Sequence, residues 1–169
     1  MEALREGAEA PDFTVLLDNG ETFTLSALRG RKNVVLYFYP RDFSPGCTRE
    51  ACTFRDEMEE FRSLSAEVVG VSLDSLESHA RFRERHSLPY PLVVDDDRQI
   101  SRAYGVLRLG GLLPLRRVTF IIDKQGIIRR VIHDELRMGR HISAALAALE
   151  ELQEGGEPPA PTPSSSDGG

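Results

Sequence analysis

The chain has 169 residues, of which 40% are hydrophobic and 28% are charged, and its formal net charge is -6. This length predicts one globular domain with a sizeable core, and it is too short for two independent ones. The acidic balance disfavours contact with nucleic acid or an anionic membrane, so we expect neither as a partner. The longest apolar runs fall far short of the ~20 residues that a membrane-spanning helix needs.

The amino-terminal stretch MEALREGAEAPDF has no basic region followed by an apolar one, so it does not resemble a secretory signal. We therefore expect a cytoplasmic protein. In that compartment thiols are kept reduced, and cysteines are more often catalytic or metal-binding than structural.

Segments typical of strands alternate with segments typical of helices. Residues 13–25 form two short apolar runs around an Asp-Asn-Gly turn, which predicts a hairpin. Residues 33–39 are apolar on both faces, as in a central strand, and Pro40 follows. Cys47, Ala51, Phe54, Met58 and Phe61 recur at steps of four and three, which predicts a helix packed on a sheet. Further strands are expected at 67–73, 91–95, 118–123 and 127–132, and further helices at 75–87, 98–106 and 140–153.

This alternation, followed by a terminal hairpin and helix, predicts an α/β sandwich with a mixed sheet. We assign residues 1–154 to one domain. From Gly155 the chain reads GGEPPAPTPSSSDGG, which is rich in Pro, Ser and Gly and has no large apolar residue. This composition predicts a disordered tail over residues 155–169.

The only two cysteines, Cys47 and Cys52, lie five positions apart in the stretch SPGCTREAC. Cys47 is expected where the loop after the central strand turns into a helix. A helix amino terminus offers unpaired N–H groups and the positive end of the dipole, which stabilise a thiolate. A free cysteine titrates near ~8.5, and this environment favours a lower value. Cys47 is therefore a candidate nucleophile; the alternative is a small buried hydrophobic residue.

The spacing of the two cysteines restricts how they can react. On a regular helix five residues correspond to a rotation of ~140° and a rise of ~7.5 Å, which separates the Cα atoms by ~8.7 Å. A disulfide needs them within ~7 Å. A bond between the cysteines therefore requires the first turns of the helix to unwind. A thioredoxin-like disulfide reductase, which typically has a CxxC pair, is disfavoured by the same spacing.

Pro40, Ser44 and Cys47 fit the active-site pattern of peroxiredoxins: proline, three residues, threonine or serine, two residues, cysteine. The setting YFYPRDFSPGCTREAC resembles the bacterioferritin-comigratory-protein or peroxiredoxin Q branch. The resemblance extends over roughly residues 6–152 through the segments GAEAPDFTV, VVLYFYP, GVSLDS and RRVTFIIDKQG. It departs at Ser44, where the family more often has threonine, whose methyl group limits its rotamers.

The resemblance implies a thioredoxin-like fold, with a central mixed sheet flanked by helices and an amino-terminal hairpin, and a thiol peroxidase without cofactor or metal. The peroxidatic Cys47 would attack hydrogen peroxide or an organic hydroperoxide and become a sulfenic acid. The resolving Cys52 would then form an intramolecular disulfide, which thioredoxin or a similar dithiol would reduce. Ser44 would orient the thiolate or peroxide, Pro40 would wall the pocket, and Arg117 would stabilise the thiolate and the leaving oxygen.

Several alternatives stay open. Arg116 replaces Arg117 if the strand register differs by one residue. A peroxide-responsive redox sensor without significant turnover is the alternative function. The resemblance favours a monomer, but an apolar loop over residues 105–116 leaves a dimer open. This loop either packs onto the core or forms an apolar rim or a partner surface, and its leucines are Leu107, Leu109, Leu112, Leu113 and Leu115.

The polar clusters are weaker candidates for a metal site. His79 and His86 lie ~10.5 Å apart along a helix axis, too far to bind one ion. We interpret them, with His133 and His141, as solvated or packing residues. The sequence DDDR at residues 95–98 can bind a cation, but capping of the following helix is favoured.

Overall fold

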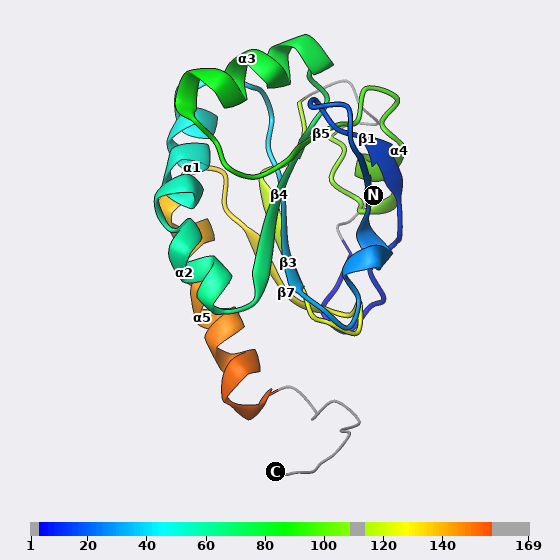
Figure 1. The fold of residues 1–169 in the computed structure, drawn as a ribbon, viewed down its shortest axis with the longest axis vertical. Helices are drawn as coiled ribbons and strands as arrows, with labels where there is room; N and C mark the ends of the chain where they lie inside the picture. Colours follow the sequence, from blue (N-terminus) through cyan, green and yellow to red (C-terminus); the bar gives the residue numbers. More distant parts are fainter. Residues whose placement is uncertain (1–3, 109–113, 157–169) are drawn as a thin grey trace.

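The computed structural model describes residues 4–108 and 114–156. Its centre is a five-stranded mixed sheet in the order β5-β4-β3-β6-β7 (Figure 1). Strands β3 (Asn33–Phe38), β4 (Ala66–Ser72) and β5 (Leu92–Val94) are parallel, whereas β6 (Val118–Ile122) and β7 (Ile128–His133) continue the sheet in antiparallel pairs. The expected α/β sandwich with a mixed sheet is confirmed, and the ends of β3 to β7 lie within one residue of their predicted positions.

The amino-terminal hairpin is also confirmed, with β1 (Thr14–Leu16) and β2 (Thr22–Thr24) paired around the Asp-Asn-Gly turn. Gly20 has a φ of +89°, a conformation that this turn needs and that glycine adopts without strain. A short 3-10 helix, η1 (Leu25–Leu28), follows. An isolated bridge between Leu17 and Val93 attaches the hairpin to β5 at the edge of the main sheet.

Residues of β3 alternate between the two faces of the sheet, and every one of them is buried. Val35 and Tyr37 belong to the core under helices α1 (Pro45–Asp56), α2 (Met58–Ser63), α3 (Leu76–His86) and α5 (Met138–Glu151). Val34 and Leu36 belong to the core under the hairpin, η1 and α4 (Gln99–Ala103). Figure 1 shows α1, α2 and α5 on one side of the sheet and β1 and α4 on the other. Two apolar layers thus enclose the central strand, as its continuous apolar run predicts.

The predicted helix after Cys47 is divided, and in this respect the prediction of one continuous helix is wrong. Helix α1 ends at Asp56, Glu57 leaves the helical conformation with φ -104° and ψ 13°, and α2 begins at Met58. The apolar pattern is nevertheless buried on both sides of the break. The rings of Phe54 and Phe61 lie 5.7 Å apart between centroids, so the two helices share one core.

Two predictions fall at the limits of the structure. In the loop at residues 105–116, Leu107 and Leu115 are buried, whereas Leu109, Leu112 and Leu113 lie outside the described residues. After α5 the backbone continues in a π-helical turn, η3 (Leu152–Gly156), and the rest of the predicted tail lies outside the described residues. Among the helices in residues 4–108 and 114–156, none is long and apolar enough to cross a membrane.

Candidate active site

Cys47 lies in the first turn of α1, as the sequence predicts. Pro45 occupies the first helical position, where its missing N–H costs nothing, and Ser44 is the amino-terminal cap. The Ser44 hydroxyl accepts a hydrogen bond from the Cys47 backbone N–H at 3.4 Å and donates one to the Arg41 carbonyl at 3.1 Å. Ser44 therefore anchors the start of the helix, a role that the sequence did not indicate. The Cys47 side chain is buried among the residues under α1.

Arg117 is the arginine that reaches Cys47. It precedes β6, the antiparallel neighbour of β3, and its Nη1 donates to Cys47 Sγ at 3.4 Å. Arg116 is half-buried, and its backbone N–H binds the Val106 carbonyl. Burial lowers the pKa of Arg117, but the charges and hydrogen bonds of Glu50 and Cys47 outweigh it and raise that pKa. A permanent positive charge therefore lies beside the sulfur.

Glu50 is a site residue that the sequence analysis missed. It is fully buried, and its Oε1 accepts a hydrogen bond from Arg117 Nη1 at 2.6 Å. Burial raises the pKa of Glu50 to about 7, against the opposing effect of Arg117. The sequence does carry a signal for it. Glu50 lies three residues after Cys47, so it shares the face of α1 on which Cys47, Ala51 and Phe54 form an apolar stripe. One guanidinium thus serves two acidic groups, Cys47 and Glu50.

Two buried polar atoms at the site have no hydrogen-bond partner among the residues that the structure describes. They are Glu50 Oε2 and Arg117 Nε. Buried polar groups are nearly always paired, so unpaired ones beside the Cys47 thiol mark a place where another molecule can bind.

His141, in α5, lies behind the Glu50 carboxylate. Its Nδ1 is 3.7 Å from Glu50 Oε2 and accepts a hydrogen bond from the Thr119 hydroxyl at 2.8 Å. Its Nε2 donates to the Asp134 carbonyl at 2.8 Å. Burial and the Arg117 charge lower the pKa of His141 despite that carbonyl, so the imidazole is neutral at neutral pH. The interpretation of His141 as a packing residue agrees with this environment.

Gly46 makes room for the arginine. A Cβ atom at this position would lie 2.8 Å from Met138 Cε and 3.2 Å from Arg117 Nη2. The first distance is shorter than real Cβ atoms tolerate, and the second is tight. A side chain at this position would force the flexible end of Met138 to move and would crowd the Arg117 guanidinium.

Pro40 and Cys52 lie at the two ends of the sequence stretch that holds Ser44 and Cys47. Pro40 follows β3 and is half-buried at the start of the loop that leads to Ser44. Cys52 is half-buried within α1, and both cysteines are free thiols. Because α1 is continuous from Pro45 to Asp56, the ideal helix separation of ~8.7 Å between the Cα atoms applies, and no disulfide can form in this conformation.

Two side-chain hydrogen bonds, one from Tyr90 and one from Arg55 of α1 itself, hold this helix in place. The Tyr90 hydroxyl donates to the Ala51 carbonyl at 2.9 Å and lies 2.8 Å from the Tyr37 hydroxyl. Arg55 Nη1 donates to the His86 carbonyl at 2.7 Å. These bonds attach the middle and the end of α1 to its neighbours.

The acidic segment at residues 95–98 caps a helix. Asp95 accepts hydrogen bonds from the backbone N–H groups of Ile100 and Ser101 at 3.0 and 2.7 Å and from the Ser101 hydroxyl at 2.6 Å. The predicted cap of the following helix, α4, is confirmed.

Comparisons with known proteins agree with these features. A model of the AhpC/TSA family matches residues 7–131. Peroxiredoxin Bcp of Bacillus subtilis is 43% identical over 155 residues, which cover 88% of this chain and 96% of that protein. The chloroplastic peroxiredoxin Q of Suaeda salsa is 40% identical over 148 residues, which cover 87% of this chain and 68% of that protein.

Solved structures extend the comparison to three dimensions. Peroxidoxin BcpB from Mycobacterium tuberculosis superposes with a TM-score of 0.83 at 38% identity, over 90% of this chain and 99% of that one. Peroxiredoxin Q of Xanthomonas campestris superposes with a TM-score of 0.76 at 34% identity, over 82% of this chain and 89% of that one. The thioredoxin-like fold expected from the sequence is confirmed.

Proposed function

Because the chain belongs to the AhpC/TSA peroxiredoxins, in the Bcp and peroxiredoxin Q branch of thiol peroxidases, we propose that it reduces hydrogen peroxide and organic hydroperoxides at Cys47. The observation that carries this proposal is the contact between Arg117 Nη1 and Cys47 Sγ at 3.4 Å, at the amino terminus of α1. A guanidinium and a helix dipole both favour the thiolate, which is the reactive form of cysteine.

In the proposed reaction the Cys47 thiolate attacks one peroxide oxygen. The O–O bond breaks, the attacked oxygen forms a bond to sulfur, and the other oxygen leaves and takes up a proton to become water or an alcohol. Arg117 Nε, which is unpaired among the described residues, is a donor for the oxygen that gains negative charge. Ser44 rotates its hydroxyl from the Arg41 carbonyl toward the peroxide, and Pro40 borders the site without an N–H that competes for the thiolate.

Resolution of the sulfenic acid is assigned to Cys52. Its thiol attacks the Cys47 sulfur, a disulfide forms and water leaves. Since the intact helix keeps the two cysteines apart, the first turns of α1 must unwind for this step. Thioredoxin or a similar dithiol then reduces the disulfide, and we propose that the enzyme works as a monomer in the cytoplasm, a reducing compartment.

Intact mass after one equivalent of peroxide tests this cycle. We expect the wild-type protein to lose two hydrogens, the Cys52→Ser variant to gain one oxygen, and the Cys47→Ser variant to stay unchanged. A gain of one oxygen in the wild type would show that Cys52 does not resolve Cys47. Steady consumption of peroxide with a thioredoxin system separates an enzyme from a redox sensor, which reacts once and stops.

The role of Arg117 has its own test. Arg117→Lys keeps the charge but loses the planar fork that contacts Cys47 and Glu50 together. We expect the rate of peroxide reduction to fall about 100-fold, the loss typical for one stabilising donor in an active site. Arg116→Lys, one position earlier, is the matched control and should retain the wild-type rate.

A further inference from the structure

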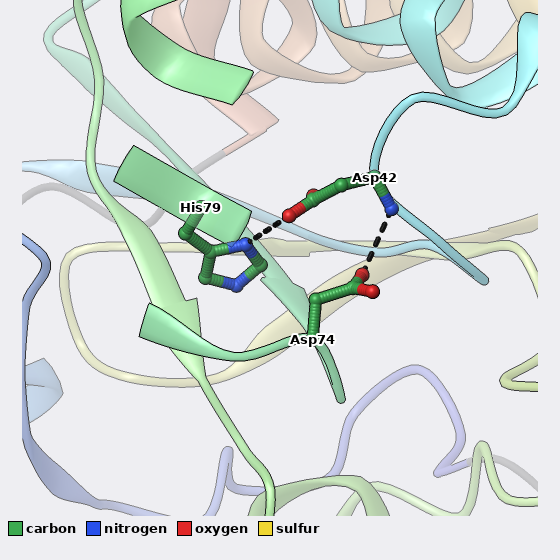
Figure 2. Close-up of side chains that lie close together, drawn as sticks. All are labelled: Asp42, Asp74 and His79. Atoms are coloured by element: carbon green, nitrogen blue, oxygen red, sulfur yellow. Dashed lines mark hydrogen bonds and ion pairs between the residues drawn. The ribbon is translucent and has the colours of Figure 1, made fainter. Parts of the chain in front are cut away.

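The loop that precedes the active-site helix is fastened by a buried ion pair. Asp42 lies between Pro40 and Ser44, and His79 lies in α3 (Figure 2). The His79 Nδ1 is 2.7 Å from Asp42 Oδ2, and the two side chains are 0% and 1% exposed. Because both side chains are shielded from solvent, the attraction between the two charges is screened less than at the surface.

Hydrogen bonding indicates that His79 is positively charged. Its Nε2 lies 2.9 Å from the Val93 carbonyl, and its Nδ1 faces the Asp42 carboxylate. Both partners are acceptors, so both ring nitrogens carry hydrogen. Burial lowers the pKa of His79, but the hydrogen bond and charge of Asp42 outweigh it and raise the pKa above its ordinary value.

Asp42 has a full set of donors. Besides His79, its carboxylate accepts hydrogen bonds from the Tyr39 hydroxyl at 2.6 Å and the Ser78 hydroxyl at 2.8 Å. Its backbone N–H donates to Asp74, whose carboxylate also accepts from the Ser72 hydroxyl. Asp42, Asp74 and His79 have the spacing of a metal site. The protonated imidazole has no lone pair to offer, so we interpret the group as an ion pair.

The backbone that this pair holds is strained. Phe43, between Asp42 and Ser44, has a φ of +68°, which bulky residues rarely adopt. Its ring packs edge-on against Phe82 of α3, with 5.1 Å between centroids. The ion pair and this aromatic contact therefore fix the same loop to the same helix. Without them the strain favours another conformation.

We propose that the Asp42–His79 pair is a latch that holds the start of α1 in the conformation that reacts with peroxide. The inference rests on the proposed function. When the latch opens, Ser44 loses its position and the first turn of α1 unwinds more readily, which brings Cys47 within reach of Cys52. Asp42 and His79 are thus positioning residues with opposite effects on two steps. They favour oxidation of Cys47 and oppose formation of the disulfide.

Asp42→Asn and His79→Gln test the latch. Each removes one charge, and the Asn variant keeps the shape of Asp42. We expect sulfenic acid to form about tenfold more slowly, because Ser44 loses its position. We expect the disulfide to form about tenfold faster, because breaking a buried pair removes stability from the folded helix and not from the unwound one. Ser78→Ala, which removes a neutral hydrogen bond to the same carboxylate, is the control and should change either rate less than about threefold.

Rapid mixing with peroxide, acid quenching and intact mass give both rates. Equal slowing of both steps, or no change, would refute the latch. If His79→Gln does not fold, Asp42→Asn decides, and faster backbone amide exchange in the first turns of α1 is the second readout. A wild-type protein that forms no sulfenic acid would instead refute the proposed function. If the wild-type protein forms sulfenic acid and both variants have the same two rates as the wild type, the latch alone is refuted.

Discussion

At the scale of single residues, the main feature of the site is that Cys47 and Glu50 share the positive charge of Arg117. Arg117 Nη1 contacts both Cys47 Sγ and Glu50 Oε1, and the three side chains are buried together. When Glu50 is ionised it competes with the thiolate for the guanidinium. When it is protonated, the guanidinium serves the sulfur alone. The ionisation of Glu50 is therefore expected to set how strongly Arg117 acts on Cys47.

Glu50→Gln should flatten part of the pH dependence of stability. The pKa of Glu50 is raised by burial from 4.5 to about 7, so between these values the folded protein binds more protons than the unfolded chain. The free energy of unfolding then falls as the pH rises through this window. Glutamine cannot ionise, so its variant should lose this contribution. Denaturant titrations at several pH values measure it.

Other titratable or charged groups lie near Glu50, so the comparison needs a variant with the same change of net charge elsewhere. These groups are Arg117, His141 and Glu135. Glu59→Gln, on the exposed face of α2, changes the net charge equally. Its pH profile should match that of the wild type. An identical profile for all three proteins would show that Glu50 has an ordinary pKa.

At the scale of secondary structure, the proposed cycle places two opposed requirements on α1. In that cycle α1 is folded when Cys47 meets peroxide and unwound when Cys47 joins Cys52. Tyr90 and Arg55 hold it through single hydrogen bonds, with a net value of ~1 kcal/mol for the neutral Tyr90 donor and ~1.5–3 kcal/mol for the charged Arg55 donor. Bonds of this size stabilise a helix without making its local unfolding rare, and they are suited to a segment that opens in each turn of the proposed cycle.

Tyr90→Phe should speed disulfide formation. The Ala51 carbonyl loses its external donor, so the unwound state becomes more accessible by about 2- to 12-fold, the equivalent of ~0.5–1.5 kcal/mol. The rate at which the sulfenic acid disappears after a single addition of peroxide measures this effect.

Tyr104→Phe makes the same chemical change on the other side of the sheet, where the hydroxyl donates to the Pro11 carbonyl. It should leave the resolution rate unchanged. If both variants speed resolution equally, general loss of stability is the cause, and the Tyr90 bond has no special role.

At the scale of the whole molecule, the parts that follow from local pattern were predictable. The Asp-Asn-Gly turn, the apolar run of β3 and the position of Cys47 depend on a few neighbouring residues, and the structure has them as expected. The break at Glu57 has no comparable local signal. No proline or glycine interrupts the stripe there.

The missed site residues depend on contacts between distant segments. Glu50 becomes a partner of Arg117 only because β6 pairs with β3. Asp42 and His79 are 37 positions apart and meet only when α3 packs beside the active-site loop. A single sequence shows the residue types but not these encounters. Cys47, Ser44 and Pro40 lie within one loop and its helix, so a short local motif that resembles peroxiredoxins was enough to indicate them.

Residues beyond 156 should be dispensable for the reaction. Their composition predicts a tail without a core of its own, and among the residues that the structure describes the last member of the two apolar layers is Leu152. A chain that ends at residue 156 should keep the wild-type rate of peroxide reduction and the same denaturant midpoint. A shift of the midpoint would show that the tail contributes to folding.

The near-ultraviolet signal of the tyrosines can report on the proposed unwinding of α1. The chain has four tyrosines and no tryptophan, so its near-ultraviolet spectrum arises mainly from the phenols. The Tyr90 hydroxyl touches the α1 backbone and Tyr37 stacks on Phe54 of the same helix, whereas Tyr104 packs with Phe38 and Phe120 in the opposite layer. Unwinding of α1 changes the surroundings of the first two and leaves the last as an internal reference. Near-ultraviolet circular dichroism can therefore follow each turn of the proposed cycle without an added label.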